Sequence, residues 1–136
     1  MDYLKWKREL KDYNWISNST PYAPYDFVII DKNGERILID VKSTDGEFGQ
    51  RFFISYNELK QMAQSEERYD LYRVYKIKKS SAMLRICKDT KAFSRNILGI
   101  LERLPNGVIA DSVAVSPSSL KFNIEITLHG EHSGNQ

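Results

Sequence analysis

Residues 21–44, PYAPYDFVIIDKNGERILIDVKST, contain two apolar runs on either side of a polar turn. The runs are 27–30 and 37–41, and the turn is 31–34. The turn begins with Asp31 and ends with Gly34, which are the residues that a type I turn prefers at its first and fourth positions. Two apolar runs joined by such a turn predict a β-hairpin.

The register of this hairpin decides where its acidic residues lie. A two-residue turn at Asn33-Gly34 would place Asp26 and Asp40 on opposite faces, because side chains alternate along a strand. A three-residue loop that ends with Gly34 in the left-handed conformation would instead place Asp26 directly opposite Asp40. In that register Lys42 shares the face of the two aspartates, because it lies two residues beyond Asp40.

Opposed carboxylates suggest a metal site. Opposed residues have Cβ atoms roughly 4.5–5.5 Å apart, and like charges at that distance repel. A divalent cation would relieve the repulsion, since hard cations take carboxylate oxygens. With Lys42 beside it, such a site suits phosphodiester cleavage, in which the metal polarises the phosphate and the lysine positions or deprotonates water, or offsets charge. The alternative is an exposed hairpin with ordinary surface residues.

A family resemblance supports the metal site. Pro24 and Asp26, a spacer and Asp40-Val41-Lys42 resemble the signature of the PD-(D/E)XK nuclease superfamily. The pattern is most similar to the branch named for the C-terminal region of the plant protein NO VEIN, which is common in bacterial restriction and phage-defence proteins. Segments 15–17, 53–59 and 69–75 extend the resemblance over about residues 13–77.

The resemblance implies a restriction-endonuclease-like α/β fold, an α+β mixed sheet with a central β-hairpin and helices packed on it. It implies that Asp26, Asp40 and Lys42 are catalytic, and that Asp26, Asp40 and the Val41 carbonyl bind Mg²⁺ or Mn²⁺. The substrate would be DNA, and the product would carry a 5′ phosphate. The expected partners are an ATPase, a helicase or a target-recognition module, with a homodimer as an option. Candidate contacts to the nucleic acid are Thr44, Arg51, Arg73 and Lys76.

Two departures from the family pattern leave a second function open. The family more often has Glu where Asp40 stands, and its N-terminal helix carries a Gly-Glu pair that has no counterpart before Asp26. The second function is a non-catalytic module on a nuclease fold, which binds nucleic acid or another protein. Metal binding would discriminate the two functions.

The composition is that of an ordinary domain. The chain has 136 residues, of which 28% are charged, and we expect one domain over 1–129 with a disordered tail at 130–136. It has no apolar run of 18 residues and no signal-peptide pattern, and its single cysteine, Cys87, fits a reducing cytoplasm. The segment from Arg73 to Arg103 contains nine basic and two acidic residues. Its basic side chains could follow a phosphate backbone or simply form a solvated surface.

The remaining segments predict strands at 51–54, 70–78, 83–87, 108–115 and 122–129, and helices at 1–13, 56–65 and 90–104. Ser55 and Glu58 form a capping box at the start of the helix over 56–65. Glu58 therefore has a structural explanation, although the resemblance includes it and leaves a catalytic role open. Gly46 and Gly49 predict a flexible loop directly after Lys42.

Overall fold

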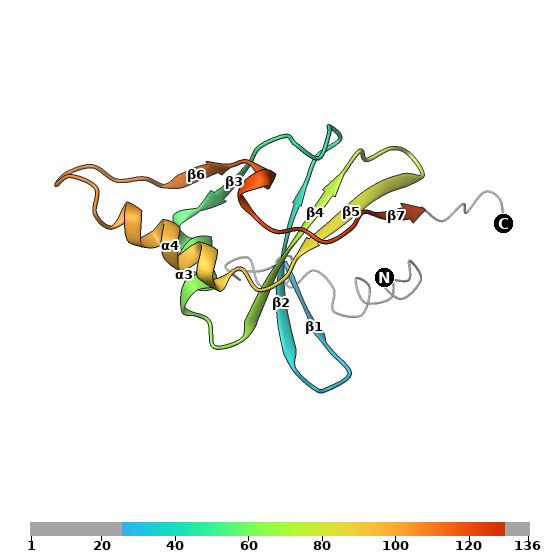
Figure 1. The fold of residues 1–136 in the computed structure, drawn as a ribbon, viewed down its shortest axis with the longest axis horizontal. Helices are drawn as coiled ribbons and strands as arrows, with labels where there is room; N and C mark the ends of the chain where they lie inside the picture. Colours follow the sequence, from blue (N-terminus) through green and yellow to red (C-terminus); the bar gives the residue numbers. More distant parts are fainter. Residues whose placement is uncertain (1–25, 130–136) are drawn as a thin grey trace.

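The computed structural model describes residues 26–129, so the expectations for the helix at 1–13 and for the tail at 130–136 lie outside it. The elements, shown in Figure 1, are β1 (Phe27–Ile30), β2 (Arg36–Ser43), β3 (Phe52–Ser55), α3 (Tyr56–Gln64), β4 (Arg68–Tyr75), β5 (Ser81–Cys87), α4 (Lys91–Leu101), β6 (Ser112–Val115), the 3₁₀-helix η1 (Pro117–Ser119) and β7 (Ile126–His129). The mixed α/β class predicted from the sequence is confirmed. Within the described range, no helix is long and apolar enough to cross a membrane.

Five strands form the main sheet, in the order β1-β2-β4-β5-β7. Strands β2 and β4 are parallel, and the other neighbours are antiparallel. A parallel pair needs a crossover connection, which β3 and α3 supply here. The predicted hairpin exists, but β1 is the edge strand of this five-stranded sheet. The resemblance implied a central hairpin, and this expectation is wrong, because the hairpin lies at the edge of the sheet.

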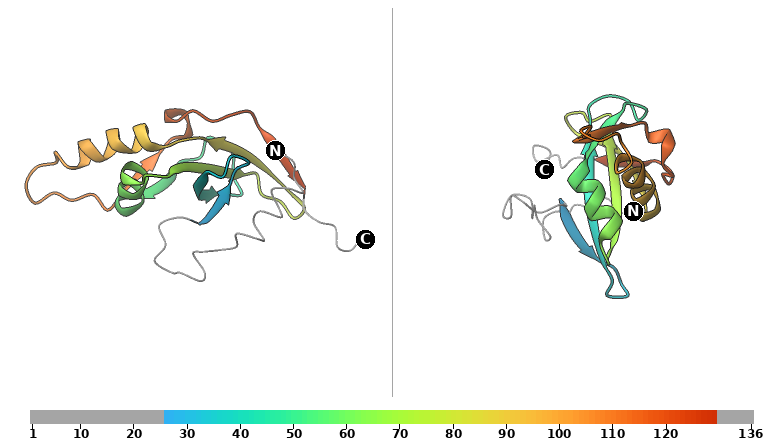
Figure 2. Two further views of the ribbon diagram at one scale, coloured as in Figure 1. Left: turned by 90° about the horizontal axis from the view of Figure 1, so that it is seen from below. Right: turned by 90° about the vertical axis from the view of Figure 1, so that its left-hand side faces the viewer.

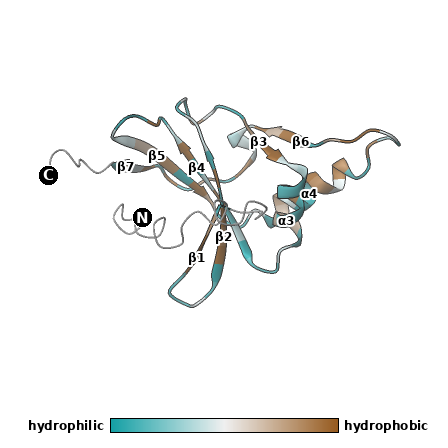
Figure 3. Cartoon of the chain, turned by 180° about the vertical axis from the view of Figure 1, so that it is seen from behind, coloured by the Kyte–Doolittle hydropathy of each residue, from teal (hydrophilic) through white to brown (hydrophobic). Residues whose placement is uncertain are grey.

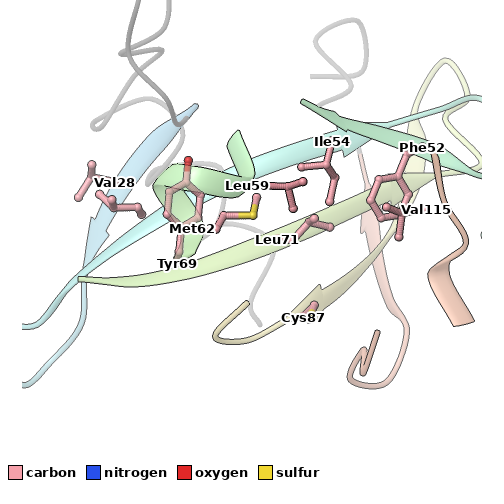
Figure 4. Packing of buried hydrophobic residues seen from close by; sticks show 10 residues of the cluster. Val28, Phe52, Ile54, Leu59, Met62, Tyr69, Leu71, Cys87 and Val115 are labelled. Carbon is pink, nitrogen blue, oxygen red and sulfur yellow. The ribbon is translucent and has the colours of Figure 1, made fainter. Parts of the chain in front are cut away.

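Both described helices pack on one face of the sheet. Leu59 and Met62 of α3 lie over Tyr69 and Leu71 of β4, and these four side chains belong to one buried cluster (Figure 4). Helix α4 runs beside α3, as the two views in Figure 2 show. Its Phe93, Ile97 and Leu101 side chains pack against the same cluster. Strands β3 and β6 form a separate two-stranded sheet next to the helices. This packing encloses the face of β2 that carries Asp40.

Strand β4 is the enclosed centre of the sheet. All residues from Tyr69 to Tyr75 are at most 8% exposed, and β4 has a strand paired on either side. Figure 3 shows the hydrophobic residues that line β4 and β5. Asp70 is an acidic exception, and it is satisfied by two 2.9 Å hydrogen bonds from Arg68 and one from the backbone N–H of Asp89.

Three predicted strands are shorter or shifted. The strand expected at 70–78 runs from Arg68 to Tyr75, and Lys76 ends it with a positive φ of 49°. Only Ser112–Val115 pairs within 108–115, and only Ile126–His129 forms a strand within 122–129. Ahead of β7, Asn123 bonds the backbone of Ile86 through both its own N–H and its side-chain oxygen, which replaces regular ladder pairing.

The burial of Cys87 gives a chemical test of this fold. Cys87 is 4% exposed, and burial raises the pKa of its thiol to about 11. Since the thiolate is the reactive species, iodoacetamide at pH 8 should label the folded protein at least about 100-fold more slowly than the urea-unfolded chain. Labelling rates measured by mass spectrometry check this. Equal rates in the two states would contradict the packing of β5.

Candidate active site

A three-residue loop sets the register of the hairpin. Gly34 adopts a positive φ of 82°, and its N–H donates to the carbonyl of Asp31 at 2.9 Å. The N–H of Asp31 donates to the carbonyl of Glu35 at 2.9 Å, which closes the loop. The Asp31 carboxylate accepts hydrogen bonds from the N–H groups of Asn33 and Glu35, both at 2.9 Å. The longer of the two predicted loops is therefore the one that forms.

This register brings the predicted metal ligands together. The ladder ends with Phe27 paired with Ile39, and the N–H of Asp26 donates to the carbonyl of Ile39 at 2.9 Å. The Asp26 carboxylate therefore lies close enough to Asp40 to act on its pKa. The Asp26 carboxylate accepts a 2.6 Å hydrogen bond from the backbone N–H of Val41. The Val41 carbonyl points to the same side of β2 as its N–H, because both groups of one residue in a strand face the same neighbour. We call Asp26, Asp40, Val41 and Lys42 the hairpin site.

Asp40 is the buried carboxylate of the hairpin site. It is 3% exposed, and its Oδ2 atom has no hydrogen-bond partner although it lies 3.2 Å from Nζ of Lys42. Burial raises the pKa of Asp40 well above its ordinary value; Lys42 lowers it, and the carboxylates of Glu58 and Asp26 raise it further. A buried carboxylate oxygen that has an ion pair with an ammonium but no hydrogen bond also suits the coordination of a cation.

The described residues supply few acidic ligands for such a cation. Within residues 26–129, no group of three or more His, Cys, Asp or Glu side chains is arranged to hold a metal ion. The protein ligands available at the hairpin site are therefore the carboxylates of Asp26 and Asp40 and the backbone carbonyl of Val41. This set fits Mg²⁺, which keeps several waters and usually binds only one or two carboxylates.

Lys42 points onto the same face and lies between two acidic side chains. Its Nζ atom is 3.2 Å from Oδ2 of Asp40, and 2.9 and 3.0 Å from the two carboxylate oxygens of Glu58. Burial lowers the pKa of Lys42, but the charges of Asp40 and Glu58 outweigh burial and raise it above its ordinary value. Lys42 is therefore a charged ammonium in this structure, with its side chain 17% exposed.

The contact between Glu58 and Lys42 was not predicted from the sequence. The predicted capping box does form, since Ser55 and Glu58 exchange two hydrogen bonds at the start of α3. That local pattern explains Glu58 without reference to the site. The family resemblance, which includes residue 58, was the only sequence signal for a role beyond the cap. Local patterns do not predict the contact with Lys42, because sixteen positions separate the two residues and the crossover connection brings them together.

The predicted nucleic-acid contacts lie in different environments. The side chain of Arg73 is 1% exposed, so its predicted contact with a nucleic acid is wrong in this structure. Arg51 is exposed, and Lys76 is partly exposed with its Nζ 3.6 Å from a Glu47 carboxylate oxygen. Thr44 is half-buried, and its hydroxyl donates to the side-chain oxygen of Gln50 at 2.9 Å.

Arg73 instead holds the loop that follows Lys42. Its guanidinium donates to the carbonyl of Lys42 at 3.1 Å and to that of Gln50 at 2.8 Å. The same group lies 5.0 Å from the centre of the Phe52 ring. Phe48 adds a second attachment, because its ring packs 5.1 Å from that of Tyr75. The loop that the glycines predicted to be flexible is thus hydrogen-bonded and packed at both ends.

The buried acid predicts a gain of stability on its removal. The pKa of Asp40 is higher in the folded chain than in the unfolded chain. Protonated Asp40 therefore makes its full contribution to the free energy of unfolding below about pH 4, and this contribution is lost as the pH rises through the folded pKa. In EDTA, Asp40→Asn should therefore raise the free energy of unfolding at pH 7.5 by roughly 0.5–2 kcal/mol, and this advantage should shrink toward pH 4. Urea unfolding at both pH values measures it, with the exposed Glu66→Gln as a control. A loss of stability at pH 7.5 would contradict the assignment.

Comparison with known proteins identifies the family. A family model described as "Protein NO VEIN, C-terminal" matches residues 1–86. No curated protein and no solved structure matches the chain. The matched range contains the hairpin site, β3, α3 and β4, and it covers more than half of the 136 residues. The chain therefore belongs to the NO VEIN C-terminal family.

Proposed function

We propose that this chain is a metal-dependent nuclease domain that hydrolyses phosphodiester bonds of DNA, with Mg²⁺ or Mn²⁺ as its metal. The observation that carries the proposal is the environment of Asp40. Its buried Oδ2 atom lacks a hydrogen-bond partner and lies 3.2 Å from an ammonium, and the Asp26 carboxylate is close enough to raise the pKa of Asp40. A buried charge in such an environment costs stability, so a role in binding a cation gives a reason for its presence.

The residues of the hairpin site would have two roles, binding the cation and stabilising charge on the phosphate. Asp26, Asp40 and the Val41 carbonyl would hold the cation, and the N–H of Val41 fixes the orientation of Asp26 with its 2.6 Å hydrogen bond. When bound, the cation would polarise the phosphate and lower the pKa of a bound water. Lys42 would stabilise the negative charge that develops on the phosphate, because it is an ammonium held by carboxylates rather than a free amine.

The surroundings support a nucleic-acid substrate. The exposed Arg51 and the partly exposed Lys76 belong to the segments that flank the loop after Lys42. Lysine and arginine side chains bind backbone phosphates without regard to sequence. Such a domain would take its target specificity from an ATPase, a helicase or a target-recognition module of a restriction or phage-defence system, as the family resemblance implies.

A second candidate function is a non-catalytic module on the same fold. The described residues offer only two acidic side chains to a metal at the hairpin site, and no group of three is arranged to hold one between residues 26 and 129. The ion pair between Lys42 and Glu58 also satisfies the lysine without any substrate. A retired site would bind nucleic acid or protein, and it would not depend on a divalent cation.

Cleavage of supercoiled plasmid tests the nuclease. The wild-type chain should nick the plasmid in Mg²⁺ or Mn²⁺ and not in EDTA. Asp26→Asn, Asp40→Asn and Lys42→Ala should each lower the initial rate by about 10²-fold or more, because each removes a group that binds the cation or stabilises charge. The controls Lys32→Ala and Glu66→Gln remove matched charges from exposed positions outside the site and should cleave like wild type.

Binding of Mn²⁺, measured by electron paramagnetic resonance, separates the two candidate functions. A nuclease site should bind Mn²⁺ in the wild type and in Lys42→Ala, and lose it in Asp26→Asn and Asp40→Asn. A folded wild type that neither binds Mn²⁺ nor cleaves plasmid would favour the non-catalytic module.

A further inference from the structure

The first turn of α3 contacts the hairpin site through Glu58. Both carboxylate oxygens of Glu58 lie within hydrogen-bond distance of Nζ of Lys42, at 2.9 and 3.0 Å. The two side chains are 25% and 17% exposed, so solvent screens this ion pair only in part. Ion pairs of this kind fix a long side chain more firmly than surface pairs do.

Glu58 is itself held in place by the backbone. Its Oε1 atom accepts a 2.8 Å hydrogen bond from the N–H of Ser55, and its own N–H donates to the Ser55 hydroxyl at 3.0 Å. Just beyond it, Leu59 is completely buried in the core, which anchors this turn of the helix. The carboxylate that binds Lys42 therefore sits on a rigid support, as a positioning group requires.

Lys42 needs such a support because its ammonium is carried on a flexible chain. Ordering a lysine side chain costs conformational entropy, because its several torsion angles must be fixed. Asp40 is the only other acidic side chain in contact with Nζ among the described residues, and Asp40 is also a proposed cation ligand. Glu58 belongs to no proposed ligand set, so its contact with Lys42 does not compete with the cation.

We propose that Glu58 is a positioning residue, which holds the ammonium of Lys42 at the hairpin site and makes the start of α3 part of that site. The catalytic consequence rests on the proposed nuclease function. The contact itself does not, because it is present in the structure without any ligand. The competing explanation is that Glu58 serves only the helix cap.

Two variants separate positioning from capping. Glu58→Gln keeps a side-chain oxygen for the N–H of Ser55, since Gln also serves in a capping box, but it removes the charge that binds Lys42. Ser55→Ala is the matched control, because it removes the hydroxyl that caps α3 but keeps the backbone N–H that bonds Oε1 of Glu58. It should lower Tm by a few degrees.

Nuclear magnetic resonance of the Lys42 ammonium in the ¹⁵N-labelled full chain reads the contact directly. An ammonium held by carboxylates exchanges its protons slowly and gives a visible signal. We expect this signal in the wild type and in Ser55→Ala, and we expect it to disappear in Glu58→Gln. Its persistence in Glu58→Gln would overturn the proposal.

Plasmid cleavage then tests the catalytic consequence. Glu58→Gln should lower kcat by about 10–100-fold with little change in KM, the usual effect of losing an outer-shell partner, while Ser55→Ala keeps the wild-type kcat. An equal loss in both variants would show that Glu58 acts only as a cap and would overturn the proposal. An inactive wild type would refute the nuclease function instead, and the ammonium signal would still decide whether Glu58 positions Lys42.

Discussion

The loop at 32–34 controls the chemistry of this chain, because it fixes the register of β1 on β2. The period of side chains in a strand is two residues, so a slip of one residue would move Asp26 to the other face. The loop prevents that slip with a glycine at φ 82° and with the Asp31 carboxylate, which bonds two N–H groups of the turn. A turn on the surface thus decides whether two carboxylates meet about five residues away along each strand.

The meeting of those carboxylates opposes folding. Asp40 is a charge in the interior, with acidic neighbours in Asp26 and Glu58 and one ammonium to offset them. The chain tolerates this cost because the same face of the sheet buries the apolar side chains of α3 and β4, including Leu59 and Leu71, which are fully buried. Buried ionisable groups that lower the stability of the fold are characteristic of functional sites, where stability is exchanged for reactivity.

The sequence predicts the local parts of this structure better than the distant ones. The hairpin and the cap of α3 follow from residues a few positions apart, whose preferences are set by turn and helix geometry. The three-residue loop is one of the two loops that the sequence left open. The contact of Glu58 with Lys42 and the burial of Arg73 depend on the parallel pairing of β2 with β4, which local patterns do not encode. Arg73 shows this most clearly, because nothing in its sequence neighbours distinguishes a surface arginine from a buried one that donates to two backbone carbonyls.

The part of the chain after residue 86, beyond the family match, supports the junction between β3 and α3 through its contacts with both elements. Strand β6 pairs with β3 from Ser112 to Val115, and the carbonyl of Asp111 accepts the N–H of Tyr56 at 2.7 Å, directly at the start of α3. Helix α4 packs along α3, and its Ser94 hydroxyl lies 3.4 Å from the sulfur of Met62. These contacts fix the junction of β3 and α3 from outside. Since Glu58 lies in the first turn after that junction, the position of Lys42 depends on α4 and β6, which follow it in the chain only from residue 91 onward.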